Sequence, residues 1–70
     1  MRMTKVSSSS IGAVGHEGDT LHVEFVTGAK YKYWPVSEEE YKELLEARSA
    51  GAYFARNIRK TKQYARVENG

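Results

Sequence analysis

The last third of the chain holds the side chains best suited to binding an anion. Arg56, Asn57, Arg59 and Lys60 lie within five consecutive residues and supply two guanidinium groups, a carboxamide and an ammonium group. Cationic groups form charge-assisted hydrogen bonds with phosphate, and planar guanidinium groups do so in a bidentate way. The segment is therefore a candidate site for a phosphate or a nucleotide. A solvated basic helix face is the alternative that the sequence leaves open.

A second candidate is the run Tyr31-Lys32-Tyr33-Trp34, which interleaves aromatic rings with a cation. On a sheet, such a run offers rings for nucleobase stacking beside a phosphate contact. Alternating apolar residues in a strand also form cores, so Tyr31 and Tyr33 have a packing interpretation as well. Trp34 falls on the opposite face of the same strand. We expect it to be exposed there and available for an interface or a ligand.

The sequence contains no recognisable catalytic motif. It contains no cysteine, which excludes thiolate zinc sites and cysteine nucleophiles. His16 and His22 are six residues apart with no metal-ligand spacing around them, so we expect both to be solvent-facing strand residues. The serines have no Gly-x-Ser-x-Gly setting, and the glutamates gather where a helix begins. We therefore expect a protein that is not an enzyme and that uses no metal or cofactor.

The elements that must position these residues are short strands and two helices. Alternating apolar residues predict strands at residues 20–26 and 30–34, and more weakly at 63–67. Residues 11–16, which include two glycines, are predicted as a weak first strand. Ser37 and Glu40 have the spacing of a capping box, which predicts a helix beginning at residue 38.

We expect Gly51 to end this helix in a left-handed conformation, and a second helix to cover residues 52–60. The predicted fold class is α+β: a small antiparallel β-sheet of three to four strands with two helices packed on one face.

The register of the central hairpin follows from burial. A three-residue loop would place Phe25 opposite Tyr31 and Val23 opposite Tyr33, with Glu24 facing Lys32 on the other side. A two-residue loop would instead place lysines on the core face. We therefore predict the three-residue loop, with Tyr31 and Tyr33 directed toward the helices.

The length and charge of the chain indicate its domain organisation and its expected location in the cell. Seventy residues make one domain, which we expect to span residues 1–70 with a core at 5–67 and flexible ends. Residues 50–70 hold five cations against one anion, a net charge of +4, and so form the basic part of the chain. No apolar run approaches the roughly 20 residues that cross a bilayer, so we expect a cytoplasmic protein, in the host cytoplasm if the source is viral.

Residues spread along the chain resemble the KTSC domain family. They include Val6-Ser7-Ser8-Ser9-Ser10-Ile11, Leu21-His22-Val23-Glu24-Phe25, Tyr31-Lys32-Tyr33, Asn57-Ile58-Arg59 and Tyr64. The resemblance covers residues 5–67, and the chain departs from it at His16, where the family often has an aromatic residue. It implies a small module named for the C-terminus of some lysyl-tRNA synthetases, which also occurs alone in bacteria and their viruses. RNA binding is the activity suggested by the synthetase association.

The residues that fit the family's pattern and the two candidate runs together form one set. The candidate ligand-binding residues are Ser8, Ser9, Tyr31, Tyr33, Trp34, Arg56, Asn57, Arg59 and Lys60.

Three functions remain open. The first is a homo-oligomer that sequesters a small phosphate-bearing nucleotide, by analogy with small viral proteins that bind cyclic-nucleotide immune signals. The second is an RNA-binding accessory module whose cations follow a phosphate backbone. The third is a protein–protein adaptor that uses Trp34 and the second helix. The cations of the RNA-binding hypothesis are Lys30, Lys32, Arg56, Arg59, Lys60 and Lys62.

Overall fold

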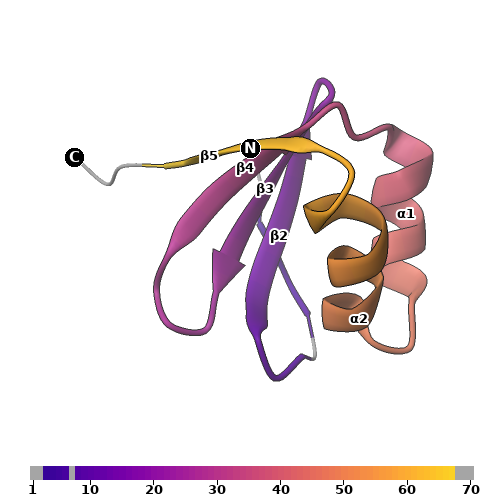
Figure 1. The fold of residues 1–70 in the computed structure, drawn as a ribbon. Coiled ribbons are helices and arrows are strands. Elements are labelled where there is room, and N and C mark those ends of the chain that lie inside the picture. Colours follow the sequence, from indigo (N-terminus) through magenta and orange to yellow (C-terminus); the bar gives the residue numbers. More distant parts are fainter. Residues whose placement is uncertain (1–2, 7, 68–70) are drawn as a thin grey trace.

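The strands of this protein follow one another in chain order across a single antiparallel sheet (Figure 1). They are β1 (Thr4–Lys5), β2 (Ile11–Glu17), β3 (Thr20–Phe25), β4 (Lys30–Trp34) and β5 (Gln63–Arg66). The structure is a computed structural model that describes residues 3–6 and 8–67. The ends expected to be flexible, residues 1–4 and 68–70, lie outside these ranges except for Met3 and Thr4, and Thr4 pairs with Val14 in β1. The four predicted strands are confirmed, and β1 is additional because two polar residues carry no alternation from which to predict it.

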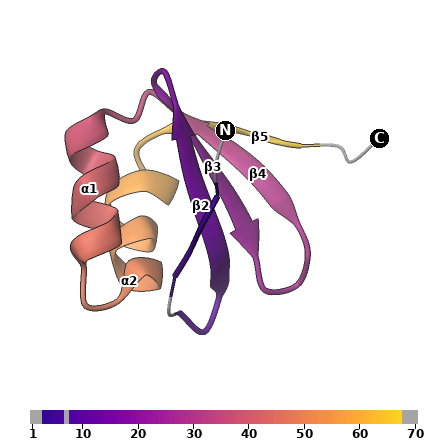
Figure 2. The same cartoon turned by 180° about the vertical axis from the view of Figure 1, so that it is seen from behind.

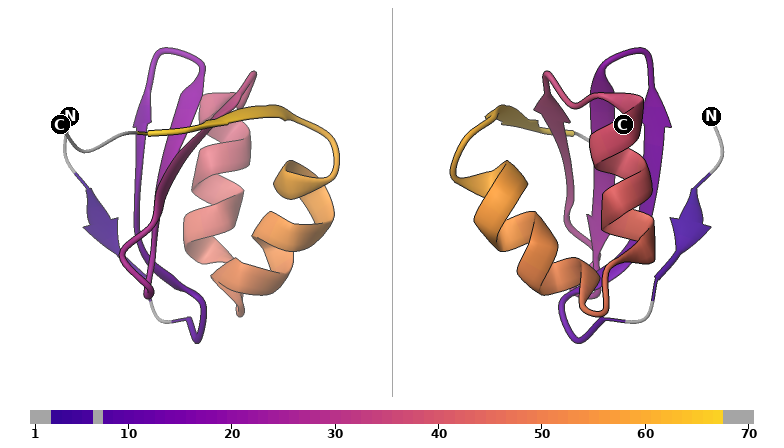
Figure 3. Two further views of the ribbon diagram at one scale, coloured as in Figure 1. Left: turned by 60° about the vertical axis from the view of Figure 1, so that its left-hand side comes forward. Right: turned by 90° about the vertical axis from the view of Figure 1, so that its right-hand side faces the viewer.

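Two helical segments lie on one face of the sheet, as predicted (Figures 2 and 3). Helix α1 covers Glu38–Glu46, and α2 covers Ala50–Phe54. The second helix continues directly into a π-helical turn, η1, at Ala55–Arg59. The α+β fold class is therefore confirmed, and the predicted second helix begins two residues early and changes its winding half-way.

The core lies between the sheet and the helices. Val14, Leu21 and Val23 from the sheet are almost fully enclosed with Leu44 and Ile58 from the helical side. Truncating a buried aliphatic side chain of this kind to alanine costs about 2–5 kcal/mol of folding free energy. A chain of this length has a small core, so each of these contacts is a large part of its stability.

The register of the β3–β4 hairpin differs from the prediction by two residues. Val23 lies opposite Tyr31, and Glu24 opposite Lys30. The loop has three residues as predicted, but it is shifted by one, because Gly28 takes a φ of 96° at its last position and Phe25 pairs with Ala29. A shift of two residues keeps each side chain on the same face of the sheet. The prediction that Tyr31 is directed toward the helices is therefore correct although its partner was wrong.

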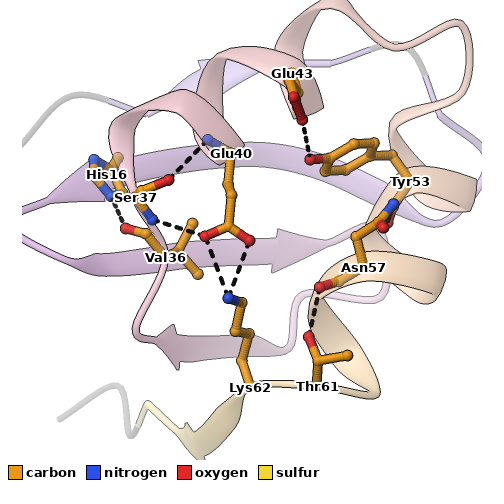
Figure 4. A network of polar contacts seen from close by, with 9 residues as sticks. All are labelled: His16, Val36, Ser37, Glu40, Glu43, Tyr53, Asn57, Thr61 and Lys62. Carbon is orange, nitrogen blue, oxygen red and sulfur yellow. Dashed lines mark hydrogen bonds and ion pairs between the residues drawn. The ribbon is translucent and has the colours of Figure 1, made fainter.

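The predicted capping box at the start of α1 is confirmed, and its Glu40 also forms an ion pair with Lys62 near the C-terminus (Figure 4). The Ser37 side chain accepts a hydrogen bond from the Glu40 backbone N–H at 3.1 Å, and the Ser37 N–H donates to Glu40 Oε1 at 3.1 Å. The Lys62 ammonium group lies 3.0 Å from Glu40 Oε2. One carboxylate thus joins the N-terminus of α1 to the segment that enters β5.

The predicted role of Gly51 was wrong. Helix α1 ends at Glu46, and Ala47 leaves it in an extended conformation. Gly51 lies in the first turn of α2, where Ser49 is the N-cap, and its φ is not positive. A Cβ atom on Gly51 would lie 2.9 Å from Ser8 Oγ and 3.0 Å from Ser10 Oγ. The loop at Ser8–Ser10, which we call the serine loop, therefore packs so closely on this position that it requires glycine. A left-handed turn is not the reason.

The predicted exposure of His16 was also wrong. The register of β2 against β3 shifts between Ile11 and Ala13, so His16 pairs with Leu21 and turns toward the helices. Its Nε2–H donates to the Val36 carbonyl oxygen at 2.6 Å (Figure 4). Its ring also stacks on Tyr41, with 5.2 Å between centroids. His16 thus secures the start of α1 at a position where an aromatic ring can make the same stacking contact.

We expect Gly51→Ala to lower the free energy of unfolding by about 1 kcal/mol, because a strained contact outweighs the helix propensity of alanine. Ser8 Oγ accepts hydrogen bonds from the N–H groups of Ser10 and Ile11, so it does not move away freely. Urea unfolding measures the change. In a Ser8→Ala background the same substitution should cost less, and an equal cost in both backgrounds would contradict the packing explanation.

We expect the capping box to make stability depend on pH. The Ser37 backbone N–H, and then the Lys62 ammonium group, hold the pKa of Glu40 below its ordinary value of 4.5, although partial burial opposes them. A carboxylate with a lowered folded-state pKa stabilises the protein above its unfolded pKa and loses this effect as the pH falls through the folded value. Thermal unfolding of Glu40→Gln should therefore show a shallower decline below pH 4.5. Glu39→Gln, in the same helical turn, is the control, and an equal flattening in both variants would contradict the assignment.

Candidate functional site

Three tyrosine rings lie together where β4 meets β5. Tyr33 is buried, with 4% of its surface exposed, whereas Tyr64 on β5 is 63% exposed. Their rings stack with centroids 5.8 Å apart and an interplanar angle of 30°. The ring of Tyr31 lies 6.3 Å from that of Tyr64. The accessible ring of Tyr64 is therefore supported from below by the buried Tyr33 and the half-buried Tyr31.

The strand register explains this grouping. Tyr33 pairs with Tyr64 across the β4–β5 border, and Tyr31 pairs with Arg66. Directly paired residues share one face of a sheet, so all four side chains lie on the face that also carries the helices. The alternation that placed Tyr31 and Tyr33 on the helix side thus places Arg66 beside the rings.

Arg59 brings a second cation to the same place. It is the last residue of η1, and its side chain is exposed. Burial and the neighbouring Tyr31 raise the pKa of the Tyr33 hydroxyl, while the positive charge of Arg59 acts in the opposite direction. Arg59 is therefore the cation of η1 whose charge acts on this group of rings. We refer to Tyr31, Tyr33, Tyr64, Arg59 and Arg66 as the tyrosine–arginine surface.

The π-helical turn holds its asparagine by contacts within the helix. Asn57 Nδ2 donates to the Tyr53 carbonyl oxygen at 3.2 Å, and Thr61 Oγ1 donates to the Asn57 carbonyl oxygen at 2.6 Å (Figure 4). Isolated π-helical turns occur often at functional sites. Here the side chain of Asn57 binds the backbone of its own helix, and the turn ends at Arg59.

Tyr53 makes the other polar link between the helices. Its hydroxyl donates to Glu43 Oε2 at 2.8 Å. Burial, and then the hydrogen bond to this carboxylate, raise the pKa of Tyr53 to about 12. The hydroxyl is therefore engaged in holding α1 against α2 and lies outside the tyrosine–arginine surface.

The serine loop lies at the other end of the molecule. Ser8 Oγ accepts hydrogen bonds from the backbone N–H groups of Ser10 and Ile11, each at 3.2 Å. The loop packs against Gly51 in the first turn of α2, whereas Arg59 ends the same helical segment. In Figure 1 the turn before β2 and the strand β5 are at opposite ends of the fold. Ser8 and Ser9 therefore do not join the site that contains Arg59.

Trp34 lies on the opposite face of β4 from the buried tyrosine rings and is half-buried rather than fully exposed. The Lys32 ammonium group lies 5.9 Å from the centre of its ring, a cation–π contact. Both residues border a shallow cavity of about 230 Å³ with Asp19 and Thr20.

The two remaining candidate cations lie on the helical side. Arg56 is exposed within η1, and Lys60 is exposed directly after it. The structure thus separates the nine candidates into four places: the loop at Ser8, the tyrosine–arginine surface, the opposite face of β4, and the exposed side of η1.

The sequence reasoning missed Tyr64 and Arg66 as site residues. The signal was present: the two are spaced by two residues in the predicted strand at 63–67, which puts them on one face. Assigning them to the site also requires knowing that this strand adds beside β4. That placement depends on tertiary contacts, among them the pair between Lys62 and Glu40.

Residues 3–6 and 8–67 contain neither a metal-binding cluster nor a membrane-spanning helix. No three His, Asp or Glu residues within them gather in a way that could hold a metal ion. Neither helix in that part of the chain has the length and apolar composition needed to span a membrane.

Comparison with known proteins identifies the family of this chain. The family model of the KTSC domain matches residues 7–65. This chain belongs to the KTSC family. A crystal structure of a KTSC domain protein from Yersinia pestis superposes with a TM-score of 0.89 at 26% identity, covering 96% of this chain and 97% of that one. A protein of Stutzerimonas stutzeri strain A1501, described as uncharacterized, is 41% identical over 56 residues, covering 77% of this chain and 79% of its own. The family expected from the sequence is thereby confirmed.

We expect Arg59→Gln to raise the pKa of Tyr33 further, because the substitution removes the charge that opposes the effect of burial. A pH titration of the tyrosine ring carbons by NMR measures this shift. Lys60→Gln, the neighbouring cation, should leave the Tyr33 resonance unchanged. An equal shift in both variants, or none in Arg59→Gln, would show that the guanidinium group does not act locally on the hydroxyl.

Proposed function

We propose that this KTSC protein is a non-catalytic nucleotide-binding protein that uses the tyrosine–arginine surface. The observation that supports this most directly is Tyr64, an exposed ring stacked on the buried Tyr33. The positive charge of Arg59 acts on the Tyr33 hydroxyl. Stacking of a nucleobase on such a ring contributes about 1–3 kcal/mol.

The chemistry of the surface suits binding rather than turnover. Arg59 and Arg66 can form bidentate hydrogen bonds with phosphate oxygens while a base stacks on Tyr64. The raised pKa of Tyr33 keeps its hydroxyl protonated at neutral pH, so it is a poor general base there. Arginine does not lose its proton in proteins. None of the five residues of the surface is therefore suited to accept a proton from an attacking group.

The most specific form of the proposal is a homo-oligomer that sequesters a small cyclic nucleotide in the cytoplasm. Sequestration requires tight binding without turnover, which the residues of this surface favour. A viral protein with this property would remove an immune signal from the host cytoplasm. The step from nucleotide to cyclic nucleotide rests on analogy with other small sequestering proteins.

A second candidate function is RNA binding, and one observation favours it. Lys32 and Trp34 form a second aromatic and cationic pair on the face of β4 opposite Tyr33. A small ligand contacts one face of a strand, whereas a polymer can pass around it and contact both. Binding of this kind releases counterions, so affinity would fall steeply as the salt concentration rises.

Thermal shift and native mass measurements with cyclic di- and trinucleotides, and with a short RNA at two salt concentrations, test the proposal. We expect a cyclic nucleotide to raise the melting temperature at a fixed stoichiometry. Arg59→Ala should weaken this binding by about one hundredfold without loss of fold, because one charge-assisted contact is removed. Lys42→Ala, an exposed cation of α1, is the control.

The other outcomes are equally informative. Salt-sensitive RNA binding with no response to small nucleotides would replace sequestration by the RNA-binding function. Unchanged affinity in Arg59→Ala would remove this residue from the site. Binding of neither ligand would overturn the nucleotide proposal and favour the third function, a protein–protein adaptor at Trp34.

A further inference from the structure

Strand β5 forms one edge of the sheet, and β4 is its single neighbour among the described strands. Figure 1 shows β5 extending past the other strands and away from both helices. The opposite edge, β1, is a two-residue strand. Unpaired backbone groups along an edge bind other strands readily unless charge, proline or a covering element prevents it. Strand β5 has no proline, and within residues 3–6 and 8–67 no helix or loop covers its outer side in Figure 3.

The hydrogen-bond pattern shows which backbone groups face outward. The Val67 N–H donates to the Lys30 carbonyl oxygen at 2.9 Å, so these residues form a hydrogen-bonded pair of the antiparallel ladder. Pairs alternate along such a ladder, so Ala65 bonds to β4 in the same way. Tyr64 and Arg66 lie between these positions. Their N–H and C=O groups therefore point away from β4, toward the free side.

We propose that two copies of this protein pair through β5, antiparallel about a two-fold axis at Ala65, so that their sheets become one. In this register the outward groups of Tyr64 bond to those of Arg66 in the second copy, and the reverse. The side chains of each such pair share the face that carries the tyrosine–arginine surface. A guanidinium group thus meets an exposed aromatic ring, which is a favourable cation–π arrangement.

Charge selects this register over its neighbours. A shift that centres the axis on Tyr64 would place Arg66 opposite Lys62 of the second copy. A shift that centres it on Arg66 would set two arginines directly opposite each other. Like charges in cross-strand pairs are destabilising, whereas pairing about Ala65 avoids both contacts and places a small side chain on the axis.

The pairing would complete the tyrosine–arginine surface from two chains. Arg66 of the second copy would lie beside Tyr64, adding a cation from across the axis, and the two surfaces would adjoin on one face of the joined sheet. A ligand with two phosphates or two bases could then contact both. This consequence rests on the proposed function, whereas the pairing itself does not.

Oxidative cross-linking of Ala65→Cys tests the pairing without any ligand. The chain has no other cysteine. Residues facing each other at a non-hydrogen-bonded antiparallel pair have Cα atoms about 4.5 Å apart, which is within the range of a disulfide. We expect a covalent dimer on a non-reducing gel. Gln63→Cys, on the same strand and face, is the matched control: the two copies of this residue would be offset by four positions, about 13 Å, and should not cross-link.

A second variant tests the edge by an independent route. The variant Arg66→Pro removes a backbone N–H that faces the free side of β5, so it should prevent the pairing without disturbing β4. We expect its circular dichroism spectrum to match that of the unmodified protein. Native mass spectrometry should show a monomer. Three results would overturn the proposal: no cross-link in folded Ala65→Cys, equal cross-linking of Gln63→Cys, or a dimer that persists in Arg66→Pro. None depends on nucleotide binding, so failure of the proposed function would leave this test unaffected.

Discussion

The position of Tyr33 between two aromatic neighbours is the constraint on which both the core and the candidate site depend. The edge of its ring meets Phe54 of α2, with centroids 4.9 Å apart and an interplanar angle of 83°, and Tyr64 of β5 stacks on it from the outer side. Aromatic pairs prefer these two geometries and contribute about 0.5–1.5 kcal/mol beyond the area that they bury. The same residue thus completes the core on one side and supports an exposed ring on the other.

Polar contacts then decide where the chain returns to the sheet. After η1, Thr61 bonds back to Asn57, and Lys62 binds the carboxylate of Glu40, which is already fixed by the capping box of α1. These contacts direct the following residues along β4 and bring Tyr64 over Tyr33. The half-buried pair between Lys62 and Glu40 adds little stability by itself. Its effect is on position, because it fixes the path by which β5 reaches the sheet.

Local rules predicted the elements and the face of each side chain, and failed where a distant contact decided the outcome. The alternation of apolar residues predicted the strands, and the spacing of Ser37 and Glu40 predicted the start of α1. Both signals depend on interactions within a few residues of the chain. His16 was misplaced because an irregularity in β2 reversed the alternation. Gly51 was misread because the serine loop, forty residues earlier in the chain, approaches it closely. For the site, the sequence indicated Tyr31, Tyr33 and Arg59, but Tyr64 joins them only through the placement of β5.

The accessible edge of the sheet and the accessible aromatic ring belong to the same strand, and this limits how the protein can act. Any partner that pairs with β5 contacts the backbone of Tyr64 and Arg66, whose side chains form part of the tyrosine–arginine surface. A ligand on that surface and a second copy on that edge would therefore share residues. Binding free energies linked in this way are reciprocal: a ligand that contacts both copies strengthens their association by the same factor by which association strengthens ligand binding. A sequestering protein that pairs through this edge would therefore form a tighter dimer in the presence of the nucleotide that it removes.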